Sequence, residues 1–440
     1  MTPMETIAAV ATAPGRGGIG IVRLSGAKAL EIALLITQRD SVDNRFAHYA
    51  KFTDRHDRVI DDGLVIGFTG PQSFTGEDCV ELQGHGGPVV IGLLLQRCLE
   101  LGARHANPGE FSERAFLNGR IDLIQAEAIA DLIAADSTTA ARQAQASISG
   151  VFSTSINQIM RDITGLRVFV EAALDFPEEE IDFISEGNVD QQVDLILEHL
   201  ARLIRQAKEG AILQGGATLV LAGKPNVGKS SLLNALSGED IAIVTDIAGT
   251  TRDVLKQTVV ICGVPFELID TAGLRTSNDP VEIEGVRRAE AAISQADILL
   301  EVIDDSSKDV SNSALTSGIK VVNKIDLTDR TPGPIDGGKA VAVSVHTGEG
   351  IDALKQLILE TLGITEQTEN RFSARERHLR ALREGHTSLA EAVQRFLATR
   401  AGELLAEDLK KTHDILGAIT GKLTSDDLLG EIFSSFCIGK

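Results

Sequence analysis

Residues 223–230 read Gly-Lys-Pro-Asn-Val-Gly-Lys-Ser and fit the spacing G-x-x-x-x-G-K-[ST] of a phosphate-binding loop. Glycines let the backbone wrap around a phosphate, and successive N–H groups point inward as an anion-binding nest. Lys229 would reach the β- and γ-phosphates of a nucleotide, and the Ser230 hydroxyl would bind Mg²⁺. The apolar run 217–222 predicts a buried strand before the loop, and 231–236 predicts a helix after it. We therefore expect a nucleoside triphosphate site here.

Three later motifs indicate that the nucleotide is GTP. Asp270-Thr-Ala-Gly273 follows a predicted strand, so Asp270 can hold the Mg²⁺ shell and Gly273 can offer its N–H to the γ-phosphate. Asn323-Lys-Ile-Asp326 also follows a predicted strand. The Asp326 carboxylate can accept from N1 and the exocyclic amine of guanine, and adenine presents neither donor. Residues 344–348 close the base site with a looser pattern.

The predicted GTP-binding residues are Asn226, Val227, Gly228, Lys229, Ser230, Ser231, Thr245, Asp246, Ile247, Ala248, Gly249, Thr250, Thr251, Asp270, Thr271, Ala272, Gly273, Asn323, Lys324, Asp326, Ser344, Val345 and His346.

The segment 245–253 lies where the first switch of a GTPase is expected, and Thr251 is the predicted second Mg²⁺ ligand beside Ser230. Leu274 follows Asp-Thr-Ala-Gly at the position where Ras-type GTPases carry a glutamine that orients water. An apolar side chain cannot do this, so catalytic groups must come from elsewhere. Asn226, with carbonyls of the 245–250 loop, could hold a monovalent cation against the phosphates. The alternative is that Asn226 only packs the loop.

Composition indicates a multidomain cytoplasmic protein. A length of 440 residues suggests about three domains, and 43% hydrophobic and 24% charged residues are ordinary for a globular chain. The N-terminus resembles neither a secretory signal nor a transit peptide, and no long apolar run predicts a membrane helix. The four cysteines are scattered and form no C-x-x-C pair, which fits a reducing compartment and argues against zinc.

The net charge of −21 argues against a general nucleic-acid-binding protein. Any RNA contact would need a local basic patch. Residues 371–400 carry seven arginines against three glutamates, so this stretch is one candidate. A solvated helix face explains the same residues equally well.

The spacing of apolar residues along the chain predicts four segments. Residues 1–118 mix strands, at 19–24, 62–68 and 79–82, with helices at 27–36 and 89–101, and 84–88 reads as a turn. Residues 119–213 and 364–440 have helical spacing, and 214–363 alternate strands with helices. The predicted fold class is a multidomain α/β chain: an α+β N-terminal domain, a helical domain, and a P-loop GTPase domain of Ras-like α/β type inserted into it.

Several motifs together resemble the MnmE (also called TrmE) family of bacterial tRNA-modification GTPases, and the resemblance covers the whole chain. The markers are residues 17–26, 74–78, 81–88 (Glu-Leu-Gln-Gly-His-Gly-Gly-Pro), 107–118, 249–253, and the terminal Cys437-Ile-Gly-Lys440. The family implies an N-terminal folate-binding domain that dimerises. It also implies a complex with the FAD protein MnmG, as a heterotetramer or larger assembly. That complex builds an aminomethyl-type or carboxymethylaminomethyl group on C5 of wobble uridine in certain tRNAs.

The resemblance also implies ligands and residue roles. Besides GTP and Mg²⁺ it implies K⁺, held by Asn226, Thr245, Ile247 and Thr250, and a tetrahydrofolate in the 5-formyl or 5,10-methylene form. Potassium-dependent pairing of G domains would drive hydrolysis. Glu282 would organise the hydrolytic water, with Glu284 as a near alternative. Folate would bind through Arg23, Glu81, Arg120 and Lys440; position 120 is often Lys in the family, and Arg keeps the charge with a different geometry.

Some interpretations stay open. Cys437 could be a prenylation site, although Ile-Gly-Lys is a poor tail for it, or a buried structural thiol, or a thiol that takes part in chemistry near the folate. For the whole chain, a GTPase switch of ribosome assembly is the alternative to tRNA modification. A folate enzyme with a regulatory GTPase is a third reading. The 81–88 run and the Cys437–Lys440 tail favour tRNA modification.

Overall fold

The computed structural model describes residues 5–135, 137–175, 189–237, 257–270, 296–307, 318–364, 372–422, 426–434, 436–437 and 439. The chain divides into two compact units. The first is Met1–Ala130 together with Gly417–Lys440, and the second is Asp131–Leu416. In the part of the chain that is described, no helix is long and apolar enough to cross a membrane.

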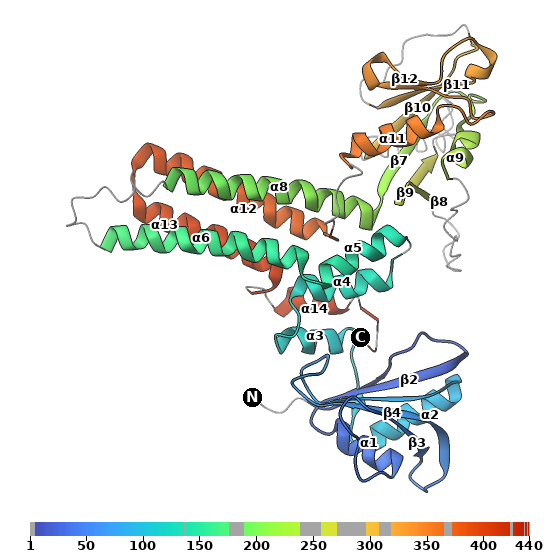
Figure 1. Cartoon of the computed structure of the whole chain (residues 1–440), viewed down its shortest axis with the longest axis vertical. Helices are drawn as coiled ribbons and strands as arrows, with labels where there is room; N and C mark the ends of the chain where they lie inside the picture. Colours follow the sequence, from blue (N-terminus) through green and yellow to red (C-terminus); the bar gives the residue numbers. More distant parts are fainter. Residues whose placement is uncertain are drawn as a thin grey trace, which may run out of the picture. The chain divides into compact units, whose positions relative to one another are not determined.

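The first unit is built on a six-stranded sheet with the order β3-β4-β5-β2-β1-β6. Its strands are β1 (Ile7–Val10), β2 (Gly17–Ser25), β3 (Ala47–Thr53), β4 (Val59–Phe68), β5 (Cys79–Gly86) and β6 (Arg104–His105). All neighbouring strands are antiparallel except β1 and β6, which run parallel. Helices α1 (Ala29–Thr37) and α2 (Pro88–Glu100) pack on the sheet (Figure 1).

Alternation along β2 and β5 decides which side chains reach the core and which stay accessible. Val22 and Leu24 of β2 join Val80 and Leu82 of β5 in the apolar cluster under the helices. Side chains of successive strand residues point to opposite faces. Residues 23 and 81, which are register partners, therefore lie on the other face of the sheet.

The predicted turn at residues 84–88 is wrong in its first half, because β5 continues to Gly86 and α2 begins at Pro88. A Cβ on Gly84 would lie 2.4 Å from the Asp61 Oδ2 atom of the neighbouring strand. The glycine therefore makes room for a carboxylate inside the sheet, where the sequence pattern suggested a loop.

The C-terminal segment returns to the first unit. Helices α3 (Glu110–Leu117) and α4 (Leu123–Ile133) are close together in the sequence. Helix α14 (Asp426–Ser434) lies almost 300 residues further along the chain and still contacts α3. A small apolar cluster joins Leu123 and Ala126 of α4 to Ile432, Phe433 and Phe436. This cluster anchors the end of the chain to the N-terminal part.

The helical part of the second unit joins segments from both sides of the nucleotide-binding region. Its helices are α5 (Thr138–Ile148), α6 (Val151–Asp175), α8 (Val189–Gly215), α12 (Glu376–Thr399) and α13 (Gly402–Thr420). Helix α12 packs along α8 (Figure 1). The Ser147 Oγ atom accepts from the Ser373 N–H at 3.0 Å, and the Phe152 and Phe372 rings stack at 4.3 Å. The predicted insertion of an α/β domain into a helical domain is therefore confirmed.

The inserted domain has a seven-stranded sheet with the order β12-β13-β11-β10-β7-β9-β8. Its elements are β7 (Ala217–Ala222), α9 (Lys229–Ser237), β8 (Gln257–Ile261), β9 (Val264–Asp270), β10 (Ile298–Asp304), β11 (Ile319–Asn323), η1 (Ile325–Leu327), β12 (Gly333–Ile335), η2 (Asp336–Gly338), β13 (Ala340–Ala342) and α11 (Ile351–Leu362). The five central strands are parallel, and the two edge strands are antiparallel. In such sheets ligands bind outside the carboxyl ends of the parallel strands, where the predicted GTP motifs lie.

Candidate functional site

The phosphate-binding loop is folded around the Lys229 ammonium. Its Nζ atom donates to the carbonyl oxygens of Gly223 at 2.7 Å and Lys224 at 3.0 Å. Gly223 and Gly228 have φ values of +147° and +99°, and Asn226 has +65°. Glycine adopts such values freely, and asparagine tolerates the left-handed region better than most residues. Ser230 lies in the first turn of α9, so the loop offers a hydroxyl and a helix N-terminus to an anion and its metal.

Asn323 connects three of the predicted motifs. It is 2% exposed. Its Nδ2 group donates to the Val227 carbonyl at 2.9 Å, and its Oδ1 atom accepts from the Val345 N–H at 3.2 Å. A Cβ on Gly228 would lie 2.4 Å from that Nδ2 atom, so the loop glycine is required for this contact. The phosphate loop, residues 323–326 and residues 344–346 are thus brought together.

Asp326 is exposed beside this junction, as a base-reading carboxylate must be. Its Oδ1 atom accepts from the Ser344 hydroxyl at 2.6 Å. Ser344 is fully buried, so this hydrogen bond ties the exposed carboxylate to the interior of the domain. The motif at 344–348 had the loosest sequence pattern, and the structure gives its first residue a definite contact.

Several predicted residues lie outside the described part of the chain: Thr245, Asp246, Ile247, Ala248, Gly249, Thr250, Thr251, Thr271, Ala272, Gly273, Glu282 and Lys440. Asp270 ends β9, and its register partner on β7 is Leu221. Its backbone is therefore at the same sheet edge as the start of the phosphate loop.

In the first unit, Arg23 and Glu81 form an ion pair between their register positions. The Arg23 Nη2 atom lies 2.9 Å from Glu81 Oε1, and their side chains are 27% and 17% exposed. The Gln83 amide donates to the second carboxylate oxygen at 3.1 Å. The Arg23 guanidinium also lies 6.0 Å from the Phe74 ring centre and 5.8 Å from that of Phe111, distances at which cation–π attraction acts.

Arg120 lies beside the loop that carries Phe74. A Cβ on Gly76 would lie 3.3 Å from the Arg120 Cγ atom. The Asn118 amide donates to the Thr75 carbonyl at 2.7 Å, which ties the end of α3 to the same loop. Arg23, Glu81 and Arg120 thus gather around residues 74–76. Phe74, which is 39% exposed, was not predicted as a site residue, because nothing in the sequence indicated its contact with Arg23.

The C-terminal tail lies next to α3 and β1. The Gly109 N–H lies 3.4 Å from the Cys437 carbonyl oxygen, and Gly109 precedes α3. Gly439 has φ +97°, and a Cβ on it would lie 2.2 Å from the Val10 carbonyl oxygen. Cys437 is an exposed free thiol, so the reading as a buried structural thiol is wrong.

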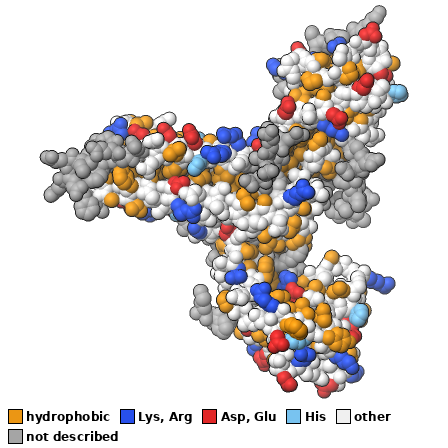
Figure 2. Space-filling model, viewed as in Figure 1, with side chains coloured by type: hydrophobic (Ala, Val, Ile, Leu, Met, Phe, Trp, Pro, Cys, Tyr) orange, Lys and Arg blue, Asp and Glu red, His pale blue; other side chains and the backbone are white. Residues whose placement is uncertain are grey.

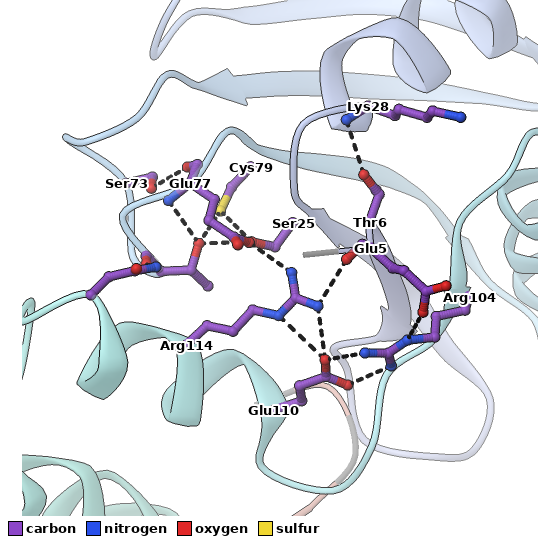
Figure 3. A network of polar contacts seen from close by, with 12 residues as sticks. Glu5, Thr6, Ser25, Lys28, Ser73, Glu77, Cys79, Arg104, Glu110 and Arg114 are labelled. Atoms are coloured by element: carbon purple, nitrogen blue, oxygen red, sulfur yellow. Dashed lines mark hydrogen bonds and ion pairs between the residues drawn. The ribbon is translucent and has the colours of Figure 1, made fainter. Parts of the chain in front are cut away.

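A buried ionic network holds α3 in this position (Figure 3). Arg114 is 2% exposed and pairs with Glu110 at 2.8 Å and with Glu77 at 2.9 Å. Arg104 pairs with the same Glu110 at 2.6 Å. Burial opposes ionisation of Glu110, but hydrogen bonds from Arg104, the Asn107 N–H and Arg114 outweigh it and lower the pKa of the carboxyl to about 2. The network fixes the helix that carries Phe111 and leads to Arg120.

In the described part of the stretch 371–400, several arginines form ion pairs within the helical part. Arg375 pairs with Asp131 at 2.7 Å, Arg395 with Asp408 at 2.7 Å, and Arg383 with Glu376 at 3.4 Å. Figure 2 shows basic side chains interspersed with acidic ones on the visible face of this part. These contacts favour the reading as a solvated, ion-paired helix face over that of an RNA-binding patch.

Comparison with known proteins places these features in one family. A family model described as the MnmE helical domain matches residues 123–437, and one described as the GTP-binding protein TrmE N-terminus matches residues 6–120. The tRNA modification GTPase MnmE of Stutzerimonas stutzeri (strain A1501) is 51% identical over 451 aligned positions, covering 99% of each chain. That of Legionella pneumophila (strain Paris) is 50% identical over 447 positions, covering 99% of this chain and 100% of the relative. Among solved structures, the G domain of the T. maritima FeoB iron transporter is 26% identical and covers 33% of this chain and 98% of that one, with a TM-score of 0.24.

Proposed function

The chain belongs to the MnmE family of tRNA modification GTPases, and on this premise we propose that its GTP hydrolysis drives formation of an aminomethyl-type or carboxymethylaminomethyl group on C5 of wobble uridine. Folate and the FAD protein MnmG would take part. The observation that carries the proposal is that one chain joins the predicted guanine-nucleotide site to a partly exposed Arg23–Glu81 pair, and that its C-terminal tail docks at Gly109, next to the helix whose Phe111 contacts Arg23. Family membership favours this function over a ribosome-assembly switch.

Nucleotide binding would use the residues that the loop and sheet edge bring together. Lys229 and the backbone N–H groups would bind the phosphates, and Asp326 would accept from guanine. Ser230 and Thr251 would hold Mg²⁺, which supplies charge neutralisation at the phosphates. The exposed position of Ser230 in the first turn of α9 fits this role.

Hydrolysis would need groups that replace the missing glutamine at Leu274. Asn226, Thr245, Ile247 and Thr250 would hold K⁺, whose charge would meet the negative charge that develops on the phosphates. Asn226 is exposed within the phosphate loop, so its side chain can reach a cation beside the phosphates. Glu282 would orient water. Pairing of two G domains would order the 245–251 loop, and hydrolysis would then depend on dimerisation.

The test of this mechanism is GTP turnover in matched potassium and sodium chloride at several protein concentrations. We expect faster turnover in K⁺ and a rise in specific rate with concentration. Asn226→Ala should lose the salt preference and keep nucleotide binding, whereas Glu282→Ala should bind GTP and pair but turn over slowly. Equal rates in both salts would remove the cation from the mechanism. A wild-type rate in Glu282→Ala would move the water-orienting role to Glu284.

Folate would bind around residues 74–76 of the first unit. The amine and a ring N–H of a pterin can donate hydrogen bonds to a carboxylate such as that of Glu81. The carboxylates of folate can pair with the guanidinium groups of Arg23 and Arg120. Support comes from the partial exposure of Arg23 and Glu81 and from the tail docked at Gly109, which leads to Lys440. Cys437, exposed in that tail, is a candidate functional thiol.

Calorimetric titration with 5-formyl-tetrahydrofolate tests this part of the proposal. Wild type should bind, and a chain truncated before Cys437 should bind more weakly. If wild type does not bind, the folate site is refuted. If the truncated chain binds equally well, the tail does not belong to the site.

The family also supports a homodimer formed by the N-terminal domain, a complex with MnmG, tRNA as substrate and a cytoplasmic location. These assignments rest on the resemblance of the full-length chain to its relatives. Co-purification of the chain with MnmG, followed by measurement of the mass of the complex, tests the partner directly.

A further inference from the structure

Asp304 makes a contact to the base-binding motif that no motif predicts. It ends β10, and its register partner on β11 is Asn323. Its Oδ2 atom lies 2.6 Å from the Lys324 ammonium, and the two side chains are 16% and 33% exposed. Its other oxygen accepts from the N–H and hydroxyl of Ser306, at 2.9 Å and 2.6 Å. The carboxylate is thus fixed by its own loop and presents one oxygen to Lys324.

Lys324 lies two positions before the carboxylate that reads guanine. Its φ of +66° is unusual for a lysine, so the backbone here is held in a specific left-handed form. Asp326 is exposed, and one oxygen of its carboxylate accepts from the Ser344 hydroxyl. A lysine ammonium without a partner would be attracted to a carboxylate two positions along the chain. Pairing between them would occupy the acceptor that guanine needs.

We propose that Asp304 is a positioning residue for guanine selection: it holds the Lys324 ammonium and so keeps the Asp326 carboxylate available to the N1–H and 2-amino donors of guanine. The proposal rests on the assignment of Asp326 as the guanine acceptor. It is independent of the potassium, folate and MnmG assignments. It predicts that loss of Asp304 changes the choice of base as well as overall affinity.

The test compares the affinities of the full-length chain for GDP and IDP, because inosine lacks the 2-amino group. In Asp304→Asn we expect the ratio of GDP affinity to IDP affinity to fall about tenfold, the value of one hydrogen bond to a charged group. Asp305→Asn is the matched control. Asp305 pairs with Arg330 at 2.9 Å and with Thr328, and contacts neither Lys324 nor Asp326 in the described structure. Its ratio should equal that of wild type.

A double-mutant cycle separates positioning from a merely structural role. Lys324→Met keeps an apolar stem and removes the ammonium that could compete. In that background Asp304→Asn should leave the GDP/IDP ratio unchanged. A similar fall of the ratio with and without Lys324, or a wild-type ratio in Asp304→Asn, would overturn the proposal. If thermal unfolding shows that Asp304→Asn is not folded, Asp304→Ser serves as the second variant. A serine also removes the carboxylate, and its hydroxyl can accept a hydrogen bond.

The assignment of Asp326 itself is checked separately. Asp326→Asn should abolish the GDP/IDP preference. If it does not, the guanine acceptor is another residue, and the failure belongs to the proposed function. If it does while Asp304→Asn changes nothing, only the role of Asp304 is refuted.

Discussion

The ionic network around α3 gives a sharp prediction, that Glu110→Gln destabilises the first unit strongly. Glu110 is 5% exposed and accepts hydrogen bonds from both Arg104 and Arg114. An amide cannot neutralise the buried guanidinium of Arg114 or the partly exposed one of Arg104. Removing one partner from a buried ionic network leaves charge uncompensated, which costs more than the loss of an exposed pair.

The magnitude follows from the pKa of the Glu110 carboxyl, which falls from 4.5 to about 2. At about 1.4 kcal/mol for each tenfold change in equilibrium constant, this corresponds to roughly 3 kcal/mol of unfolding free energy. Because the folded pKa is depressed, this contribution is present above the unfolded value near 4.5. It is lost as the pH falls toward about 2. The difference between wild type and variant should therefore shrink in that window.

Tyr49 provides the assay. It is the single tyrosine in a chain without tryptophan, and it lies in β3 of the same sheet. Its hydroxyl bonds with Asp62, so its fluorescence should change when the sheet unfolds. Urea unfolding followed by this signal should show the loss for Glu110→Gln. Glu113→Gln is the control on the same helix. Burial and then the charge of Glu110 raise the pKa of Glu113, so its ionised carboxylate does not stabilise the folded state and an amide should not destabilise it. Equal midpoints for the two variants at neutral pH would refute the reasoning.

Two further predictions concern the two ligand sites. Asp326→Asn should shift preference from GTP toward xanthosine triphosphate in a competition assay, since an amide can donate to the extra carbonyl; an unchanged preference contradicts the assignment. Gly439→Ala should loosen the tail and weaken folate binding several-fold in calorimetry, because its Cβ would lie 2.2 Å from the Val10 carbonyl oxygen. Gly430→Ala, where no atom lies within 4 Å of the added Cβ, is the control, and equal folate affinity in both variants would exclude a role for tail packing.

The sequence predicted those features that depend on local pattern. The phosphate loop, the guanine motif and the strand at 79–82 each follow from residues close together in the chain. The family resemblance is confirmed by the comparisons. The helical domain with its insertion was predicted because residues 119–213 and 364–440 both have apolar residues at helical spacing, and the region between them alternates strands with helices.

Contacts between distant residues could not be predicted from one sequence. The Asp304–Lys324 pair depends on the neighbouring positions of β10 and β11. The contact of Phe74 with Arg23 depends on a loop folding back over the sheet. Gly84 looked like a turn residue because its role, making room for Asp61, is visible only when the strands are paired.

The central claim is that this GTPase modifies wobble uridine, and mass spectrometry of tRNA nucleosides tests it most directly. Cells that lack the gene should accumulate tRNA with wobble uridine unmodified at C5. The wild-type gene should restore the modification, and a gene carrying Lys229→Ala, which lacks the phosphate-binding ammonium, should not. Wobble nucleosides that are the same with and without the gene would contradict the account, even if the purified protein hydrolyses GTP.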